Sequence, residues 1–439
     1  MTSLSKSATQ KINDLSQRWT AFPNLEVVGR YEYFSQSIHV PTVEKEHADK
    51  SKESNDFVLK RKTLGVFIHE LTHWLDHTST LWGHGNLVRL YQAVDARLHG
   101  SEPDLWRIPL ALADNKRTHF NEYYTEYGPA VDAGRPWLAT YTCGREYGLD
   151  GRVRNDRPVV FVRFSAPTAG LAVRAPLSVA ALLETRAVYA ELRADSKFIS
   201  KLDKDERIVT EKIWQTEMLD RLYTARHAAY TVAAHVVSNY MGSSDVFDTF
   251  KCSSFLAGIA LNLPSSLFGS LRRPDALHPW RDIIPHMISG QNRGYAFLVM
   301  AMSLPKGEMD FDERIRLMLK AAGLPDAPEL HTQILGNMLA LSTSAHLHGQ
   351  DRAQRLRRLL SIGYGYQGTF GPAAAPYLAN NAVLQAETKT ILPPIILGDG
   401  HLLQYGLPLP KECEVSEEWV TQAWDDDQQL QEFFEACLP

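Results

Sequence analysis

The feature that most constrains the fold is a pair of histidines, His69 and His73, placed four residues apart in the pentapeptide HELTH. Residues 63–77 contain no proline, and apolar side chains recur there at helical spacing, which predicts a half-buried helix. Residues i and i+4 of a helix project from one face, so both imidazoles can reach a single ion. A buried imidazole without a polar partner costs free energy, so this helix needs a partner from another segment. Hydrogen-bonded core histidines are the alternative interpretation.

The spacing of the two histidines suits zinc, because imidazole nitrogens bind this ion at about 2.0–2.1 Å. Glu70 directly follows the first histidine, so its carboxylate can take a proton from a water beside the ion without being a ligand. The segment HELTHWLDH resembles the active-site helix of the zincin metallopeptidases. The resemblance implies that His69 and His73 bind Zn²⁺ as the cofactor and that Glu70 is the general base.

A catalytic zinc site of this type needs a third protein ligand, and the residues that closely follow the motif supply it poorly. The metzincin pattern would place a glycine and a histidine where this chain has Asp76 and Ser79. His77 would lie about 12 Å along the helix axis from His69, too far to close a tetrahedron. We therefore expect Asp76 and His77 to contact a ligand or to lie on the surface. His84, in a glycine-flanked loop, is a further candidate ligand if the chain folds back.

A second helix over residues 178–195 is the better source of the third ligand, and Ser178 marks its start. Glu184, Glu191 and Asp195 recur at intervals of seven and four residues, which places them on one face of that helix. Small residues accompany this face and would let the two helices approach closely, namely Ala180, Ala187 and Ala194.

This arrangement resembles the gluzincins, in which a glutamate on a following helix completes the site and a later acid orients a ligand histidine. The resemblance implies that Glu184 is the third metal ligand and that Glu191 or Asp195 is hydrogen-bonded to a histidine or to the bound water. Glu184 is preferred because its neighbours are more apolar, where an unpaired carboxylate would be costly. Glu191 stays open as the ligand, since it begins the E-x-x-x-D spacing of the gluzincins. In a third interpretation both glutamates are solvated or paired with Arg186 and Arg193.

Peptide hydrolysis would also need a hydrogen-bond donor for the oxyanion, and the candidates are Tyr123, Tyr124, Tyr127 and Tyr189. The sequence thus predicts a zinc-dependent peptidase that acts on an intracellular protein or peptide, with the helical second half selecting the substrate or binding a regulatory protein. The alternative is a helical interaction protein whose zincin-like domain uses the metal for structure only. The presence of Glu70 favours catalysis, because a structural zinc site has no use for a general base.

Composition and charge agree with a globular protein of two or three domains in a reducing compartment. Of the 439 residues 44% are hydrophobic, and the four cysteines form no C-x-x-C pair. The net charge of −5 does not indicate the basic surface that nucleic-acid-binding proteins usually have. The polar N-terminus and the lack of a run of about 18 apolar residues predict neither a signal peptide nor a membrane span. We therefore expect a cytoplasmic protein without a nucleic-acid or membrane partner.

The order of the predicted elements indicates an α+β zincin-like N-terminal domain followed by a mostly α-helical C-terminal region. The first domain would cover residues 1–203, with a helical insertion at 86–150. A helical domain at 204–362 and a C-terminal segment at 363–439 would follow it.

Strands are expected at 25–34, 36–41 and 157–165, and further helices at 4–20, 206–240, 246–262, 311–322, 329–347 and 350–362. Residues 43–56 are highly charged and predict an exposed loop or the frayed start of the histidine helix. Residues 363–376 predict a glycine- and proline-rich break. The acidic helix at the end of the chain should dock through an apolar side made of Trp419, Trp424, Leu430 and Phe433.

Overall fold

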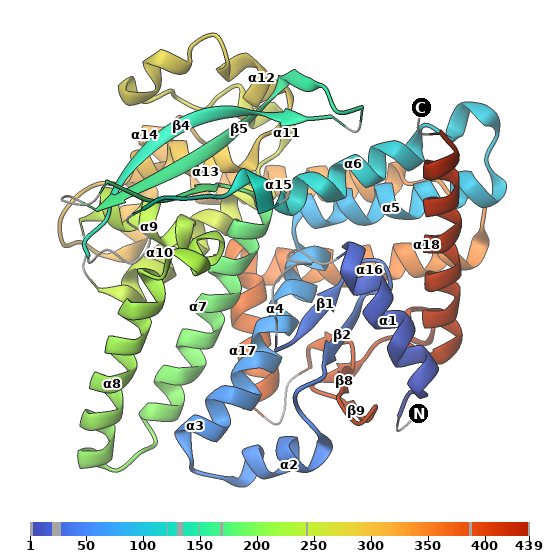
Figure 1. The fold of residues 1–439 in the computed structure, drawn as a ribbon, viewed down its shortest axis with the longest axis horizontal. Helices are drawn as coiled ribbons and strands as arrows, with labels where there is room; N and C mark the ends of the chain where they lie inside the picture. The colour runs from blue at the N-terminus through green and yellow to red at the C-terminus, as the bar shows by residue number, and fades with distance from the viewer. Residues whose placement is uncertain are drawn as a thin grey trace. The chain divides into compact units, whose positions relative to one another are not determined.

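The computed structural model describes residues 3–19, 28–120, 122–129, 135–148, 150–166, 170–242, 245–385 and 389–437. It is about 66% helical with a few small sheets, so the fold is mixed α+β (Figure 1). The mixed class agrees with the coarse expectation from the sequence, and its zincin-like character stays a prediction. Within the described ranges, no helix is both long enough and apolar enough to cross a membrane.

The chain forms two compact units, each made of several separate segments. The first unit comprises Met1–Asn115, Ala190–Arg207 and Met338–Pro439, and the second comprises Lys116–Tyr189 and Ile208–Asn337. These units differ from the three consecutive domains expected at 1–203, 204–362 and 363–439. The reason is that hydrophobic periodicity shows which residues share a face but not which faces meet.

The first unit is built around helix α4, against which α5, α16, α17 and strands β1 and β2 pack. Its helices are α1 (Lys6–Trp19), α2 (Lys45–Glu53), α3 (Phe57–Lys60), the π-helical turn η1 (Arg61–Gly65), α4 (Val66–Ser79), α5 (Leu81–His99), η2 (Glu102–Asp104), α16 (Gln350–Phe370), η6 (Gly371–Ala373), α17 (Ala374–Leu384), η7 (Lys411–Cys413) and α18 (Glu417–Cys437). Four helices continue from one unit into the other: α6 (Arg107–His119), α7 (Val179–Ile199), α8 (Lys204–Leu222) and α15 (Ala327–Ser344).

The sheet of the first unit joins the two ends of the chain. Its strand order is β1-β2-β8-β9, in which β2 pairs in parallel with β8, so that Ile38 lies opposite Ile395. Its strands are β1 (Arg30–Glu32), β2 (Ser37–Val40), β8 (Ile395–Leu397) and β9 (Leu402–Leu403), and a separate parallel pair is formed by β7 (Ile391–Leu392) and β10 (Leu407–Pro408). The C-terminal segment is therefore part of the unit that carries α4.

Helix α4 is surrounded on all sides, which differs from the half-buried helix expected from its apolar spacing. Of its 14 residues 12 are buried, including polar ones such as Thr72, Asp76 and His77. The C-terminal helices α16 and α17 pack against α4 (Figure 1). Polar residues at these positions must therefore find hydrogen-bond partners inside the unit.

In the second unit, helices pack on an antiparallel sheet of order β3-β6-β5-β4. Helix α9 contacts β4 and β6, and α10 and α13 pack on α9. The strands are β3 (Glu126–Tyr127), β4 (Leu138–Tyr147), β5 (Val153–Ala166) and β6 (Gly170–Pro176). The helices within the unit are η3 (Glu122–Tyr124), η4 (Ala225–His227), α9 (Ala228–Met241), α10 (Val246–Asn262), α11 (Ser265–Phe268), η5 (Asp275–Trp280), α12 (Ile284–Ser289), α13 (Arg293–Met302) and α14 (Phe311–Ala322).

Several expected elements are confirmed, among them the strands at 36–41 and 157–165 and the helices at 246–262 and 311–322. The strand expected at 25–34 lies partly outside the described residues, and its described part contains β1. The helical insertion expected at 86–150 is wrong in its second half, where β4 forms a long strand paired with β5. Aromatic and β-branched side chains in β4 favour this strand.

Three further expectations are corrected. Residues 43–56 contain a helix of their own, α2, and the helix expected at 206–240 is divided into α8 and α9. The break expected at 363–376 is wrong at its start, because α16 continues through its glycines to Phe370. Tertiary packing overrides the low helix propensity of glycine there.

The C-terminal helix α18 docks on the first unit, as its apolar side indicated. Leu430 is buried, and the indole Nε1–H of Trp419 donates a hydrogen bond of 2.8 Å to the carbonyl oxygen of Ser35. Trp424 and Phe433 are half-buried. The acidic residues of α18 also take part, since Asp427 accepts a 2.8 Å hydrogen bond from the indole of Trp19.

Candidate metal centre

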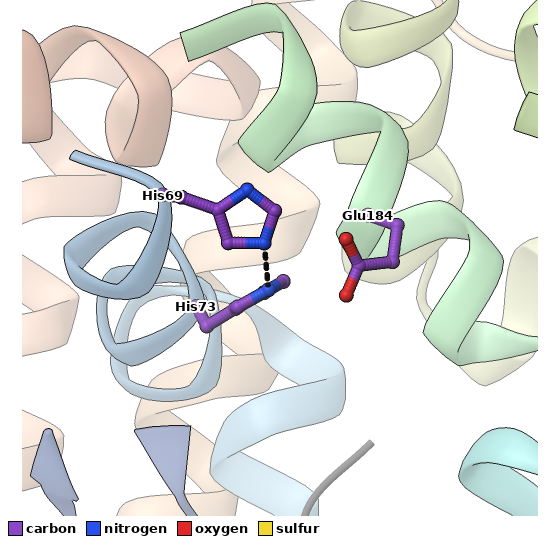
Figure 2. Close-up of side chains that lie close together, drawn as sticks. All are labelled: His69, His73 and Glu184. Atoms are coloured by element: carbon purple, nitrogen blue, oxygen red, sulfur yellow. Dashed lines mark hydrogen bonds between the residues drawn. The ribbon is translucent and has the colours of Figure 1, made fainter. Parts of the chain in front are cut away.

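Helix α4 places His69 and His73 one turn apart, with their rings directed at the same space (Figure 2). Their Nε2 atoms lie 3.0 Å apart. Two ligand atoms at about 2.0–2.1 Å from a tetrahedral zinc would be separated by roughly 3.3–3.4 Å. The observed separation is a few tenths of an ångström shorter, so the two nitrogens need only small side-chain rotations to share one ion.

Helix α7 brings Glu184 toward the two histidines (Figure 2). The helix begins where the hydroxyl oxygen of Ser178 accepts a 3.1 Å hydrogen bond from the backbone N–H of Ala181, which caps its first turn. The ligand atoms of Glu184, His69 and His73 all lie within 4.8 Å of one another. Among the described residues, no other group of three or more histidine, cysteine or acidic side chains is arranged to hold a metal ion.

Glu191 contacts the opposite nitrogen of the first histidine, at Nδ1 of His69. A carboxylate only accepts hydrogen bonds, so this contact places the imidazole proton on Nδ1 and leaves the Nε2 lone pair directed at His73. Glu184 therefore lies in the group that could hold a metal ion, and Glu191 lies behind His69. The interpretation that both glutamates are solvated is wrong, because Glu184 is buried and Glu191 lies against His69. The alternative that they pair with Arg186 and Arg193 stays a prediction.

The E-x-x-x-D spacing does not identify which acids of α7 contact the histidine helix at the candidate site. Asp195, which closes that spacing, lies 3.3 Å from the guanidinium of Arg61 in the turn before α4. The residue that contacts His69 instead follows Glu184 by seven positions, two helical turns. Asp195 thus ties α7 to the start of the histidine helix.

Glu70 is buried on the same helix and is directly adjacent to His69 in the chain. Its side chain lies against the backbone of Gly29, just before β1. Sequence reasoning did not identify Gly29, because a single glycine ahead of a strand carries no periodic signal and marks no side-chain chemistry. Only the close approach of β1 to α4 reveals the contact.

His77 belongs to a buried aromatic cluster. Its Nδ1 is hydrogen-bonded to the hydroxyl of Tyr31 at 2.6 Å, and its ring stacks on Tyr33 with the centroids 4.8 Å apart. Burial lowers the pKa of His77 to about 3, so the ring is neutral. The expectation that Asp76 and His77 could lie on the surface is wrong, since α5 and the sheet cover both.

His84 is committed to a structural hydrogen bond. Its Nε2 donates to the carbonyl oxygen of Thr78 at 2.7 Å, and burial lowers its pKa to about 4. The glycine-flanked loop expected around His84 is wrong, since these residues are helical and His84 lies in the first turn of α5. It is therefore not part of the group that could hold a metal.

The four candidate tyrosines have other contacts. The Tyr124 hydroxyl accepts a 2.8 Å hydrogen bond from the backbone N–H of Tyr147, and Tyr123 and Tyr127 are exposed. The ring of Tyr189 packs against Phe247 with the centroids 5.7 Å apart. An oxyanion role for any of these tyrosines stays a prediction.

The residues present fit a zinc ion by the chemistry of their donors. Two imidazole nitrogens and one carboxylate are a ligand set that zinc takes in catalytic sites, where its fourth position is open. The carboxylate on the far nitrogen of His69 is the usual means of fixing a ligand imidazole. Comparison with protein families, curated proteins and solved structures gives no match, so the assignment of a metal centre depends on this geometry alone.

Proposed function

We propose that the chain is a zinc-dependent peptidase that hydrolyses a protein or peptide substrate, with Glu70 as general base. The observation that carries the proposal is the convergence of His69, His73 and Glu184 to within 4.8 Å, on the helix where Glu70 follows the first ligand. This constellation is the donor set of a zinc peptidase together with its base.

In the proposed reaction, separate residues of the chain bind the metal, orient a ligand and transfer the proton. His69, His73 and Glu184 would hold the ion, and Glu191 fixes the ring of His69 through its Nδ1. A zinc ion, when bound, supplies Lewis-acid chemistry that polarises the scissile carbonyl and makes a water more acidic.

Glu70 moves the proton. Its carboxylate takes a proton from the attacking water as the water oxygen bonds to the carbonyl carbon. It then gives that proton to the amide nitrogen as the carbon–nitrogen bond breaks, which returns the carboxylate to its starting state. The side chain is 5% exposed, so the proton is transferred in a site largely shielded from bulk water.

The alternative function is a zincin-like domain that uses the metal for structure alone. Structural zinc sites are usually closed by four protein ligands. The group found among the described residues has three, which supports an open position and hence catalysis. A regulatory protein partner for the helical region is a further part of the proposal.

The metal is tested by the zinc content of the purified protein. We expect about one zinc per chain in the wild type and most of it lost in His69→Ala, His73→Ala and Glu184→Ala. The matched control is His47→Ala, which removes an exposed histidine of α2. Full zinc retention in a variant lacking both His69 and His73 would refute the site.

The base is tested by Glu70→Gln, which should keep both the fold and the zinc but lose hydrolysis, because only proton removal is disabled. Since the substrate is not identified, the measurement is a mass-spectrometric comparison of new peptide termini in lysates treated with wild type and with Glu70→Gln. Termini that depend on Glu70 support the peptidase. Stoichiometric zinc without any such termini would favour the structural alternative.

A further inference from the structure

Gly29 occupies a position where no side chain fits. It lies directly before β1, and its backbone passes against the side chain of Glu70. A Cβ atom added there would lie 2.9 Å from both Cγ and Oε1 of Glu70 and 3.0 Å from Cγ1 of Val66. Ordinary carbon contacts are about 3.5–4.0 Å, so the Cβ of any other residue would force either the Gly29 backbone or the contacting side chains of α4 to move.

The backbone around Gly29 is held on both sides. The carbonyl oxygen of Val28 accepts a 3.1 Å hydrogen bond from the hydroxyl of Thr42, and Arg30 pairs with His39 in the antiparallel β1–β2 ladder. The side chain of Glu70, by contrast, can change rotamer about several bonds. Because a side chain can change rotamer at a lower cost than a backbone held in a strand ladder can move, an added methyl group would displace the carboxylate of Glu70 rather than the strand.

We infer that Gly29 is a positioning residue for Glu70. Because Gly29 has no side chain, the carboxylate of Glu70 can adopt the rotamer in which it acts as the base. The inference depends on the proposed function only in that Glu70 is taken as the general base. In a site of this kind a displacement of about 1 Å can cost roughly 100-fold in rate. Gly29 would thus control catalysis without touching substrate or metal.

The chain offers a matched control in Gly65, at the end of the π-helical turn before α4. Its backbone is helical, with φ −58° and ψ −45°, and an added Cβ would meet nothing within 4 Å. Gly65→Ala therefore makes the same chemical change near the same helix without a contact to Glu70.

The contact itself is tested by a double-mutant cycle on the metal-free full-length protein. Gly29→Ala should lower the melting temperature by roughly 2–4 °C, and the loss should be clearly smaller in the Glu70→Ala background, where only the contact to Val66 remains. Gly65→Ala should behave identically in both backgrounds. An equal loss in both backgrounds, or no loss in either, overturns the inference.

The positioning role is tested on the metal-loaded protein. On a synthetic peptide containing one of the Glu70-dependent cleavage sites, Gly29→Ala should retain one metal per chain while kcat falls roughly 100-fold with KM unchanged, and Gly65→Ala should match the wild type. The pH at which the visible spectrum of the Co²⁺-substituted protein changes should also shift in Gly29→Ala, but not when Glu70→Gln is already present. Unchanged kcat and an unshifted spectrum in Gly29→Ala overturn the inference.

The two proposals fail in different ways. A wild type that binds no metal or shows no Glu70-dependent hydrolysis refutes the peptidase, and a catalytic role for Gly29 with it, whatever the melting temperatures show. A wild type that is active, with Gly29→Ala as active as Gly65→Ala, refutes the role of Gly29 alone.

Discussion

Helix α16 approaches the last turn of α4 closely at Gly363. A Cβ atom added at Gly363 would lie 1.6 Å from the carbonyl oxygen of Thr78 and 3.0 Å from Nε2 of His84. To restore even a tight contact, α16 would have to move away by roughly 1.4 Å. The same carbonyl accepts the hydrogen bond of His84, so the substitution also disturbs a buried polar pair.

The cost of Gly363→Ala can be worked out from these contacts. Forcing a methyl group into a packed interface costs typically about 1–3 kcal/mol, and disturbing a buried hydrogen bond costs about 1–3 kcal/mol more. Replacing glycine by alanine within a helix returns up to about 1 kcal/mol. Together these contributions lower the free energy of unfolding by about 1–6 kcal/mol, and we expect a loss near the middle of that range, roughly 3 kcal/mol, for Gly363→Ala.

Gly365, two residues further along α16, provides the control, because an added Cβ there meets nothing within 4 Å. Gly365→Ala should leave the free energy of unfolding unchanged or raise it by up to about 1 kcal/mol. Urea titration of both variants at pH 7, followed by circular dichroism, measures the difference. If the two alanine variants unfold at the same urea concentration, α16 does not approach α4 as described and the reasoning is refuted.

Two further predictions concern the imidazoles. Glu191→Ala should weaken zinc binding or activity by about 10–100-fold, measured by competition with a chromophoric chelator, whereas Glu211→Ala at an exposed position of α8 should change neither. The second prediction is acid lability: the folded-state pKa values of His77 and His84, about 3 and 4, lie below the ordinary value of 6.5. Below pH 6.5 the folded chain therefore binds fewer protons than the unfolded chain. The free energy of unfolding is highest above pH 6.5, and it falls by about 1.4 kcal/mol per pH unit for each histidine as the pH is lowered toward the folded-state pKa. Urea titrations at pH 7 and pH 5 should show this fall, and equal stability at the two pH values would contradict the neutral, buried state of both rings.

The candidate site was largely predictable because each of its parts depends on local periodicity. The separation of four residues between His69 and His73 fixes one helical face whatever the rest of the chain does. The intervals between Glu184, Glu191 and Asp195 do the same for α7. The apolar neighbours of Glu184 indicated that it would be buried, as the structure shows.

The architecture around the site could not be predicted in the same way. Helices α16 and α17 cover α4 from segments nearly 300 residues away in the chain, and β8 completes the sheet begun by β2. No pattern within a window of a few turns records such pairings. For this reason the two units differ from the consecutive domains expected, and α4 is almost fully buried instead of half-exposed.

By itself, the sequence determined which residues share a face: His69 with His73, and the acidic residues Glu184, Glu191 and Asp195 of α7. Only the tertiary structure decided which of these faces meet and what each residue contacts there. It directed Glu191 rather than Asp195 to His69, and it placed His77 against Tyr31 instead of near a metal. The physical reason is that helical spacing follows from backbone geometry within a few residues, whereas the partner of each face depends on how distant segments pack together.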